Sequence, residues 1–433
     1  MKALKLLPIV LCLILAGCGS DDNIIDNGGT DVPTDGETTG DIPEPYSVVS
    51  VEPSKSFLPT DEERTANEAL NSFAYEFAIK SILTDGKDGV KGMNLSVSPL
   101  SLTTYLGVLA NSVDDKNTER ICAALGVSNL ATLDSINHKL IRYLANPANG
   151  AVLETANSVW YSEGAVPLNS YVDCMRATYY TDVNAADFTS KEGLRIIDTW
   201  VSEKTHGLIP SISESISLSY EQTAVLINAL YFNGEWKEKF NTDDTKKEIF
   251  HGTEEDIECD MMHNTFETTY KADERFELIE LDFKGYTTIS LLLPKQETDL
   301  NDLDDYLLSK SVSLFNSGKK IVEATVALPK FSLNSETSVS AILADMNLNL
   351  NGLRLEKTGI DGRIPGEIVQ KSVINIDEEG AKLAALTFND LTFSGEDETE
   401  PDKISITFDR PFLFFVRNTH TGSILMAGRV EKP

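Results

Sequence analysis

The amino-acid sequence predicts an α+β fold on three observations. Apolar residues follow helical spacing from residue 61 to about Leu144, whereas later segments show mostly the alternation or apolar runs of strands. The two kinds of pattern do not alternate regularly, as they would in a doubly wound α/β fold. The composition, 41% hydrophobic and 24% charged, is that of a globular protein with ample core. Length alone, 433 residues, would suggest two or three domains, and no internal repeats occur.

The first seventeen residues predict a lipoprotein signal peptide. Residues 1–5 form a short basic start, and residues 6–15 form an apolar stretch that is too short to span a bilayer. Small residues then lead to Cys18, and the whole resembles a bacterial lipobox. On this interpretation the chain is cut before Cys18, which then carries the lipid. An ordinary signal peptide, cut after a small residue, is the alternative.

Residues 18–60 predict an acidic, disordered tether, because Asp, Gly, Thr, Pro and Ser dominate and apolar periodicity is almost absent. Residues 20–22 (SDD) resemble the surface-export signal of Bacteroidota lipoproteins, or are simply the start of an acidic linker. We therefore expect a protein anchored by lipid to the bacterial outer membrane, on its inner or its outer face.

The folded domain is expected over residues 61–433. Thr60 and Glu63 resemble a capping box at the start of its first helix, and apolar residues at helical spacing follow them. Strand patterns then predict strands in segments 152–161, 224–232, 287–293, 321–328, 369–376, 404–408 and 412–417.

The passage from residue 373 to residue 415 is the most informative part of the chain. Residues 373–377 predict a strand, residues 378–385 form a tract of mostly small side chains, and residues 393–401 have the composition of a loop. A tract of small residues attached to a strand can extend it into a neighbouring sheet, because such residues impose little steric cost on entry.

This passage and several other blocks resemble the serpin family. Residues 377–381 (DEEGA), with Ala384 and Ala385, are similar to the family's hinge. The further blocks, which occur in the family's order, are residues 94–102 (NLSVSPLSL), 200–207 (WVSEKTHG), 228–240 (NALYFNGEWKEKF), 328–331 (LPKF), 409–415 (DRPFLFF) and 428–430 (GRV).

The resemblance implies a serpin fold, in which helices pack on a large central mixed or antiparallel sheet, with smaller sheets and an exposed reactive loop. It also implies a suicide-substrate inhibitor of serine endopeptidases, with cysteine endopeptidases as a further class. The protease would be acylated at the loop, and the freed arm would insert into the main sheet as a new strand. A serpin-fold protein that binds or protects at the surface without inhibiting is the alternative.

The resemblance assigns a hinge to the start of this arm. Leu383 and Leu386 depart from the family's run of small residues, and a larger inward-facing group should slow insertion, which favours the non-inhibitory alternative. The hinge residues are Glu378, Glu379, Gly380, Ala381, Lys382, Leu383, Ala384 and Ala385.

The resemblance also implies a polar sheet-opening region. Ser98, Ser101 and Asn228 match its residues, and Gln370 stands where the family usually has His. A Gln side chain can replace the hydrogen bonds of a neutral His, although it does not titrate.

The reactive bond is expected near Phe393, Ser394 and Gly395. Counting the family's usual fourteen positions on from Gly380 reaches Ser394, whereas counting eleven back from Pro411 reaches Glu400. The forward count is preferred because the length of the arm must match the strand that it becomes. A cut one position earlier would follow Phe393.

The residue before the cut selects the protease. Phe393 suits a chymotrypsin-like or cathepsin G-like enzyme, and Ser394 suits an elastase. No Lys or Arg lies between Lys382 and Lys403, so trypsin-like targets are not expected.

Other functions lack the residues that they need. A formal net charge of −31 argues against nucleic acid, heparin-like polyanions and anionic membrane surfaces as partners, and leaves the lipid anchor as the only membrane contact. No nucleophile elbow, metal motif or nucleotide fingerprint occurs, so we expect no enzymatic activity, cofactor or metal. We also expect the protein to be a monomer. Cys122, Cys174 and Cys259 are expected to be buried free thiols.

Overall fold

The computed structural model describes residues 46–83, 93–147, 152–213, 224–360, 362, 368–381 and 401–433. Residues 44–433 form one unit, with residues 1–43 separate from it.

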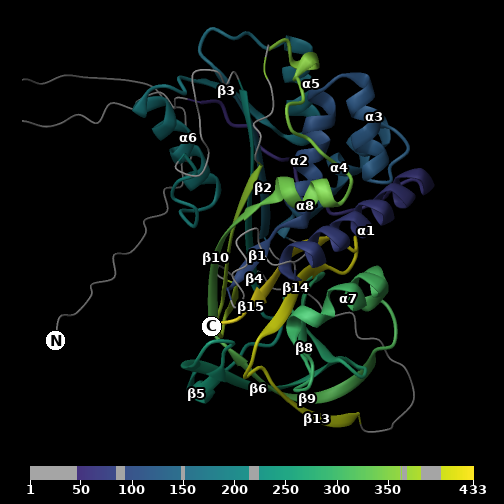
Figure 1. Ribbon diagram of the computed structural model, residues 1–433, viewed down its shortest axis with the longest axis vertical. Coiled ribbons are helices and arrows are strands. Elements are labelled where there is room, and N and C mark those ends of the chain that lie inside the picture. Colours follow the sequence, from purple (N-terminus) through teal and green to yellow (C-terminus); the bar gives the residue numbers. More distant parts are fainter. Residues whose placement is uncertain are drawn as a thin grey trace, which may run out of the picture. The chain divides into compact units, whose positions relative to one another are not determined.

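The longer helices gather on one flank of this unit, where α1 to α5 lie together, whereas α6 lies on the opposite flank (Figure 1). The helices are α1 (Asp61–Leu83), α2 (Pro99–Ser112), α3 (Asp115–Ala124), α4 (Leu130–Leu144), α5 (Asn169–Tyr179), α6 (Lys191–Lys204), α7 (Asp304–Lys310) and α8 (Val339–Asp345). The short 3₁₀ helices are η2 (Thr242–Asp244), η3 (Leu300–Leu303), η4 (Ser311–Leu314) and η5 (Glu356–Thr358).

The predicted capping box at the start of α1 is confirmed. The Thr60 backbone N–H donates to Glu63 Oε2 at 2.6 Å, and the Glu63 N–H donates to Thr60 Oγ1 at 3.3 Å. Burial would raise the pKa of Glu63, but hydrogen bonds from Lys139, Ser135 and the Thr60 backbone outweigh it and lower the pKa to about 2.

The largest sheet has nine strands in the order β1-β15-β14-β8-β7-β6-β9-β13, and β5 pairs with β6 beside this path. Strands β8, β14 and β15 are buried along their whole length, which explains their continuous apolar runs. The strands are β1 (Leu95–Val97), β5 (Lys246–His251), β6 (Asp256–Ala272), β7 (Phe276–Asp282), β8 (Thr287–Pro294), β9 (Lys320–Pro329), β13 (Asp402–Thr407), β14 (Phe412–Asn418) and β15 (Ile424–Val430).

Two smaller sheets carry the candidate site. One has the order β12-β4-β2-β3, and the other is the antiparallel pair β10-β11. Within the described residues no ladder pair joins β4 to β11, so the two sheets remain separate. Their strands are β2 (Val152–Ser162), β3 (Asp182–Ala186), β4 (Ala224–Glu235), β10 (Phe331–Ser338), β11 (Val369–Ile376) and β12 (Gly380–Ala381).

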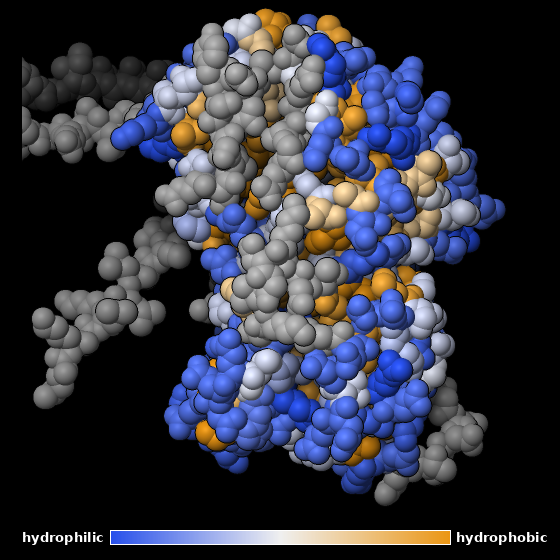
Figure 2. All heavy atoms as spheres, viewed as in Figure 1, coloured by the Kyte–Doolittle hydropathy of each residue, from blue (hydrophilic) through white to orange (hydrophobic). Residues whose placement is uncertain are grey.

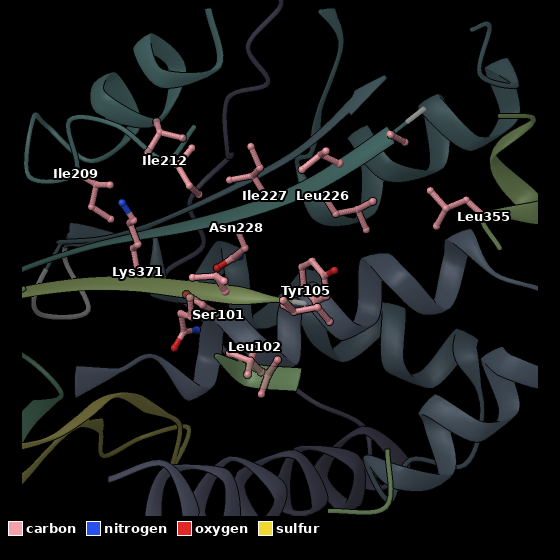
Figure 3. A pocket seen from close by; sticks show the side chains of 17 residues that line it. Ser101, Leu102, Tyr105, Ile209, Ile212, Leu226, Ile227, Asn228, Leu355 and Lys371 are labelled. Carbon is pink, nitrogen blue, oxygen red and sulfur yellow. The ribbon is translucent and has the colours of Figure 1, made fainter. Parts of the chain in front are cut away.

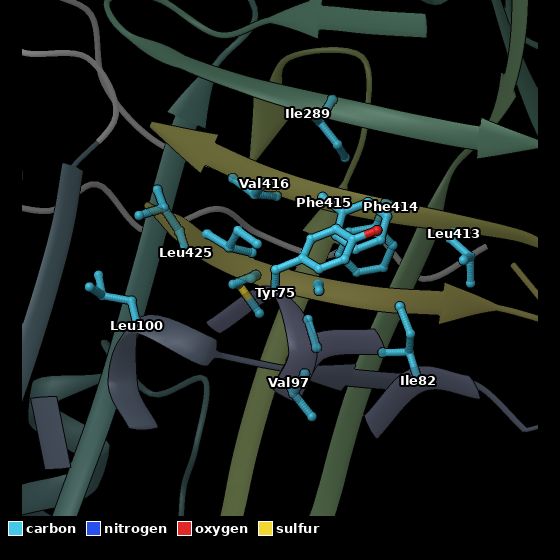
Figure 4. Close-up of a cluster of buried hydrophobic side chains, with 14 of the residues drawn as sticks. Tyr75, Ile82, Val97, Leu100, Ile289, Leu413, Phe414, Phe415, Val416 and Leu425 are labelled. Atoms are coloured by element: carbon cyan, nitrogen blue, oxygen red, sulfur yellow. The ribbon is translucent and has the colours of Figure 1, made fainter. Parts of the chain in front are cut away.

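The main core lies between α1, α2 and the buried strands of the nine-stranded sheet. Tyr75 of α1, Phe414 and Phe415 of β14, Leu100 and Leu425 all belong to this core (Figure 4), and the Tyr75 ring packs edge-on against Phe315 with centroids 5.8 Å apart. The Tyr75 hydroxyl donates to the Leu307 carbonyl at 2.8 Å, so its one polar atom is satisfied although the ring is buried. Burying a side chain of this size contributes roughly 1.5–3 kcal/mol to stability.

Residues 46–59, which we call the strap, differ from the tether that the sequence predicted up to residue 60. Tyr46 and Phe57 are only 8% and 9% exposed, because both rings pack on the folded domain. The sequence did not reveal this, since two isolated aromatic residues in a polar stretch produce neither helical nor strand periodicity.

Hydrophilic residues cover most of the described surface on the face shown in Figure 2, as the strongly acidic composition leads one to expect. Cys122, Cys174 and Cys259 are free thiols, as predicted, but only Cys122 and Cys259 are buried, whereas Cys174 is half-buried. No helix among the described residues combines the length and apolar character needed to cross a membrane.

Candidate functional site

The candidate site is the space between β4 and β11, which we call the seam. It holds a cavity of about 70 Å³. Figure 3 shows side chains from four elements around it: Ser101 and Tyr105 of α2, Ile227 of β4, Lys371 of β11, and Ile209 after α6. The lining is mainly aliphatic, so the seam would accept an extended strand with small or apolar side chains.

Ser98, Ser101 and Gln370, three of the four residues predicted for sheet opening, meet at one side of the seam. The Ser98 N–H donates to Gln370 Oε1 at 2.8 Å, and Gln370 Nε2 donates to the Ser98 carbonyl at 2.9 Å. The Ser98 hydroxyl also caps α2, since it accepts from the Ser101 N–H at 3.3 Å. The Gln370 amide thus joins β11 to the start of α2 through two hydrogen bonds.

Asn228, the fourth predicted residue, lies across the seam on β4 and is not bonded to the other three. Its Nδ2 donates to Asn157 Oδ1 at 2.6 Å, and Asn157 Nδ2 donates to the Tyr179 carbonyl at 3.1 Å. Asn228 Oδ1 is buried and has no hydrogen-bond partner among the described residues. The polar group is therefore divided between the two edges, and one acceptor is left unused.

Sequence reasoning missed Asn157 and Lys371. The Lys371 ammonium reaches from β11 to the Ser211 carbonyl at 3.1 Å, in the loop after α6, and to Glu336 at 3.4 Å. A polar amide or a lysine within a buried strand is itself unusual, so both residues carried a signal that the sequence could have supplied.

The hinge begins with a tight turn at the end of β11. The Asp377 N–H donates to the Gly380 carbonyl at 3.1 Å, and the Gly380 N–H donates back to the Asp377 carbonyl at 3.2 Å. Gly380 has φ +119°, and a Cβ atom there would lie 2.3 Å from the Gly234 carbonyl oxygen. Only glycine fits, because both the backbone angle and the space exclude a side chain.

The first residues of the arm already pair with β4. Strand β12 is antiparallel to β4, with Gly380 opposite Glu235 and Ala381 opposite Gly234. Beyond this pairing, the side of β4 that faces the seam has no ladder partner among the described residues. The arm therefore starts at the mouth of an unpaired strand edge.

Two lysines hold the hinge glutamates. Lys330 Nζ lies 2.8 Å from Glu378 Oε2, and the Thr245 hydroxyl donates to Glu378 Oε1 at 2.7 Å. Burial would raise the pKa of Glu378, but these two hydrogen bonds outweigh it and the pKa is lowered. The neighbouring Glu379 forms an ion pair with Lys239 that is much more exposed.

Trp236 binds the turn through two hydrogen bonds. Its indole Nε1 donates to the Asp377 carbonyl at 2.8 Å, and its backbone N–H donates to the Glu379 carbonyl at 3.1 Å. The ring stacks on Phe283 with centroids 4.4 Å apart and an interplanar angle of 6°. Trp236 thus fixes the position from which the arm leaves β11.

Several predicted residues lie outside the described residues. They are Cys18, Lys382, Leu383, Ala384, Ala385, Phe393, Ser394 and Gly395.

Among the described residues, no group of three or more His, Cys, Asp and Glu side chains could hold a metal ion. What the site does offer is a gap between two strand edges, with the start of a further strand at its mouth.

Known proteins resemble this chain over most of its length. The family model described as "Serpin (serine protease inhibitor)" matches residues 68–433. A serpin-like protein of Thermococcus kodakarensis is 26% identical, with 100% of this chain and 99% of its own covered. The human leukocyte elastase inhibitor is 25% identical, with 84% of this chain and 100% of its own covered.

A solved structure bears on the fold. The native state of the thermophilic serpin tengpin superposes with a TM-score of 0.73 at 24% identity, and the match covers 89% of this chain and 98% of that one. The predicted α+β fold, with helices on a large mixed sheet and smaller sheets, is confirmed.

Proposed function

This chain belongs to the serpin family, whose members are generally inhibitors without enzymatic activity, and from that premise we propose that it is a suicide-substrate inhibitor of serine endopeptidases. Cysteine endopeptidases are a second target class. The observation that carries the proposal is the open seam with the arm's first residues already paired on β4.

The proposed cycle starts when a protease takes the loop after the hinge as a substrate. Its nucleophile attacks the scissile carbonyl, an acyl-enzyme forms, and the new amino terminus departs. The arm then continues the pairing that Gly380 and Ala381 have begun and fills the seam between β4 and β11. Dragging the attached protease distorts its oxyanion hole before water can complete hydrolysis.

The seam provides the driving force for this step. An inserted strand would pair with β4 on one side and with β11 on the other, which converts two free strand edges into ladders. Apolar side chains around the cavity, such as Ile227 and Leu102, would then be covered. Asn228 Oδ1 would also gain a donor from the new backbone.

We propose an elastase-like, chymotrypsin-like or cathepsin G-like target. Phe393 or Ser394 before the scissile bond favours these classes, and the human relative named leukocyte elastase inhibitor is consistent with the first. A monomer suffices, because the arm and the seam belong to the same chain.

The test is to incubate the protein with neutrophil elastase, cathepsin G and chymotrypsin. A covalent adduct that survives denaturing electrophoresis is expected with at least one of them. The matched control is the same protease with its catalytic serine replaced by alanine, which should form no adduct. Cleavage of the loop without any adduct would contradict inhibition of these enzymes.

A second candidate function is surface binding or protection by a serpin fold that does not inhibit. Leu383 and Leu386 favour it, since large side chains in the arm fit a narrow seam poorly. Loop cleavage without gain of stability would support this candidate over the first.

We further propose that Cys18 carries a lipid that anchors the protein to the bacterial outer membrane. The apolar segment before it resembles a signal peptide and is too short to act as an anchor itself. Replacing Cys18 with Ala should move the protein from the membrane fraction to the soluble fraction. A variant that stays in the membrane fraction would exclude the lipobox.

A further inference from the structure

The first residues of the strap are hydrogen-bonded to β3, the edge strand of the sheet that contains β4. The Ser47 N–H donates to Asn184 Oδ1 at 2.9 Å, and Asn184 Nδ2 donates to the Ser47 carbonyl at 3.2 Å. The Val49 N–H donates to Asp182 Oδ1 at 2.5 Å. Two side chains of β3 therefore hold the strap's backbone along this edge.

Tyr46 fastens the same end to α6. Its hydroxyl donates to Glu203, and its ring packs edge-on against Trp160 with centroids 6.0 Å apart. Trp160 in turn packs against Trp200 of α6. Because α6 contacts both β3 and β4, this end of the strap is attached to the elements on the β4 side of the seam.

The other end of the strap fastens to α4 and to the β14–β15 turn. The Ser54 N–H donates to the Arg142 carbonyl, and Arg142 Nε donates to the Glu52 carbonyl, both at 2.8 Å. Phe57 packs against Tyr143 and His420, with centroids 5.6 and 6.3 Å apart. The strap thus connects β3 and α6 to the helical flank.

Strand insertion requires a relative movement that this connection opposes. A strand can enter between β4 and β11 only if these strands separate, and β4 carries β2 and β3 with it. The strap ties β3 and α6 to α4, so the contacts of Tyr46, Ser47 and Val49 must stretch or break when that sheet shifts. The family model begins at residue 68, so the strap lies before the part of the chain that it matches.

The strap also contains one bond that a trypsin-like protease could cut. Lys55 and Ser56 are both exposed and lie in neither helix nor strand. Lys55 is the only Lys or Arg between Lys5 and Arg64. The few polar contacts on either side of it place the segment among the parts of a fold that open most easily.

We propose that the strap braces the sheet against insertion, and that a trypsin-like protease removes the brace by hydrolysing the Lys55–Ser56 bond. Water adds across the peptide bond, so a carboxylate remains on Lys55 and an amine on Ser56. The inference rests on the proposed insertion of the arm. The loop has no Lys or Arg between Lys382 and Lys403, so such a protease would cut the strap without meeting a matching reactive bond there.

The experiment uses the full chain in two forms, the natural one and Lys55→Gln, digested briefly with trypsin under the same conditions. Every other tryptic cut occurs in both forms, so only the Lys55–Ser56 bond distinguishes them. Mass spectrometry should find a product that begins at Ser56 only in the natural form. Elastase then cuts the loop, and the fraction of heat-resistant protein is followed with time.

A second pair of variants tests the brace without cutting it. Asn184→Ala combined with Tyr46→Phe removes four hydrogen bonds to the strap, whereas Val48→Ala alters an exposed strap residue that is 46% accessible. We expect heat resistance to develop about tenfold faster after the Lys55 cut and in the double variant, and at the natural rate in Val48→Ala.

The outcomes separate the two proposals. If heat resistance develops in the natural chain but neither the Lys55 cut nor the double variant changes its rate, the brace is wrong and insertion stands. A chain in which Lys55 is not cut by trypsin overturns the proposed cleavage. If no form gains heat resistance, the proposed inhibition is wrong, and the proposed bracing role of the strap is wrong as well because it depends on insertion.

Discussion

At the scale of single residues, the hinge combines a glycine that has no substitute with a carboxylate held by two donors. Gly380 allows the chain to turn within contact distance of β4, and Glu378 fixes the turn to Lys330 and Thr245. These contacts hold the arm at the mouth of the seam before any protease acts. Substitutions here should therefore change the fate of the arm more than the fold.

If the chain is an inhibitor as proposed, replacing Ala381 with Arg should convert it into a substrate. The Ala381 backbone pairs with Gly234 at the entrance of a mainly aliphatic seam, and a guanidinium buried there would cost on the order of several kcal/mol. Gel electrophoresis should show that elastase still cleaves the loop while the covalent adduct decreases at least tenfold. Adduct formation at the natural level would contradict the hinge assignment.

Replacing Glu378 with Gln should destabilise the protein by about 1–3 kcal/mol at pH 7, because two charge-assisted hydrogen bonds are weakened at a site that is 6% exposed. The folded-state pKa of Glu378 lies below its ordinary value of 4.5. Its contribution is thus complete above pH 4.5 and is lost as the pH falls through the lower folded value.

Urea denaturation from pH 7 down to pH 3 would measure this difference. Glu379→Gln is the matched control, since the Glu379 side chain is 60% exposed and its ion pair with Lys239 should contribute less than about 1 kcal/mol. Equal effects of the two substitutions would contradict the anchoring role of Glu378.

At the scale of elements, the sequence predicted those helix and strand positions that are determined by residues close together in the chain. The capping box at Thr60 and Glu63 marks the start of α1 because both reciprocal hydrogen bonds form within four residues. The strap was missed because Tyr46 and Phe57 are fixed by rings on other elements. The division of the polar site, with Asn228 bonded to Asn157 away from Gln370, depends on which strands pair and cannot be seen in either segment alone.

The start of α1 gives a prediction at this scale. Glu63→Gln should destabilise the protein by roughly 3 kcal/mol or less at pH 7, since a pKa of about 2 in place of 4.5 corresponds to about that free energy. The difference should persist above pH 4.5 and disappear as the pH falls from 4.5 towards 2. Thermal denaturation of the two proteins across this range would measure it.

Glu68→Gln serves as the control, because Glu68 lies on the exposed side of the same helix. It should change stability by less than about 0.5 kcal/mol. A Glu63→Gln protein that is as stable as the natural one at pH 7 would contradict the stabilising role of the Glu63 carboxylate.

At the scale of the whole molecule, two sheets that could be one remain apart. The sheet with β4 and the pair β10-β11 share the seam, yet no described ladder closes it. A fold of this kind keeps free strand edges and an unfilled cavity, both of which an added strand would remove. From the proposed function we therefore expect the intact protein to be less stable than the form with its arm inserted.

Cutting the loop once between Phe388 and Glu400 should therefore raise the unfolding temperature by on the order of 10 °C or more, with both fragments still associated. Ordinary nicking of a loop leaves stability equal or lower, so the sign of the change is decisive. Calorimetry of cut and intact protein would measure it, and mass spectrometry would identify the broken bond. An unchanged or lower unfolding temperature would favour the non-inhibitory candidate.

The seam also has a consequence for biosynthesis. The ribosome completes β2, β3 and β4 by residue 235, whereas β10 and β11 emerge about a hundred residues later, between residues 331 and 376. The arm follows them, and β13, which pairs with β9 in another sheet, comes after the arm in the chain. A nascent chain that paired β13 with β9 promptly would have the far end of its loop secured before the arm could fill the seam. We therefore expect prompt pairing of β13 with β9 to favour the open form.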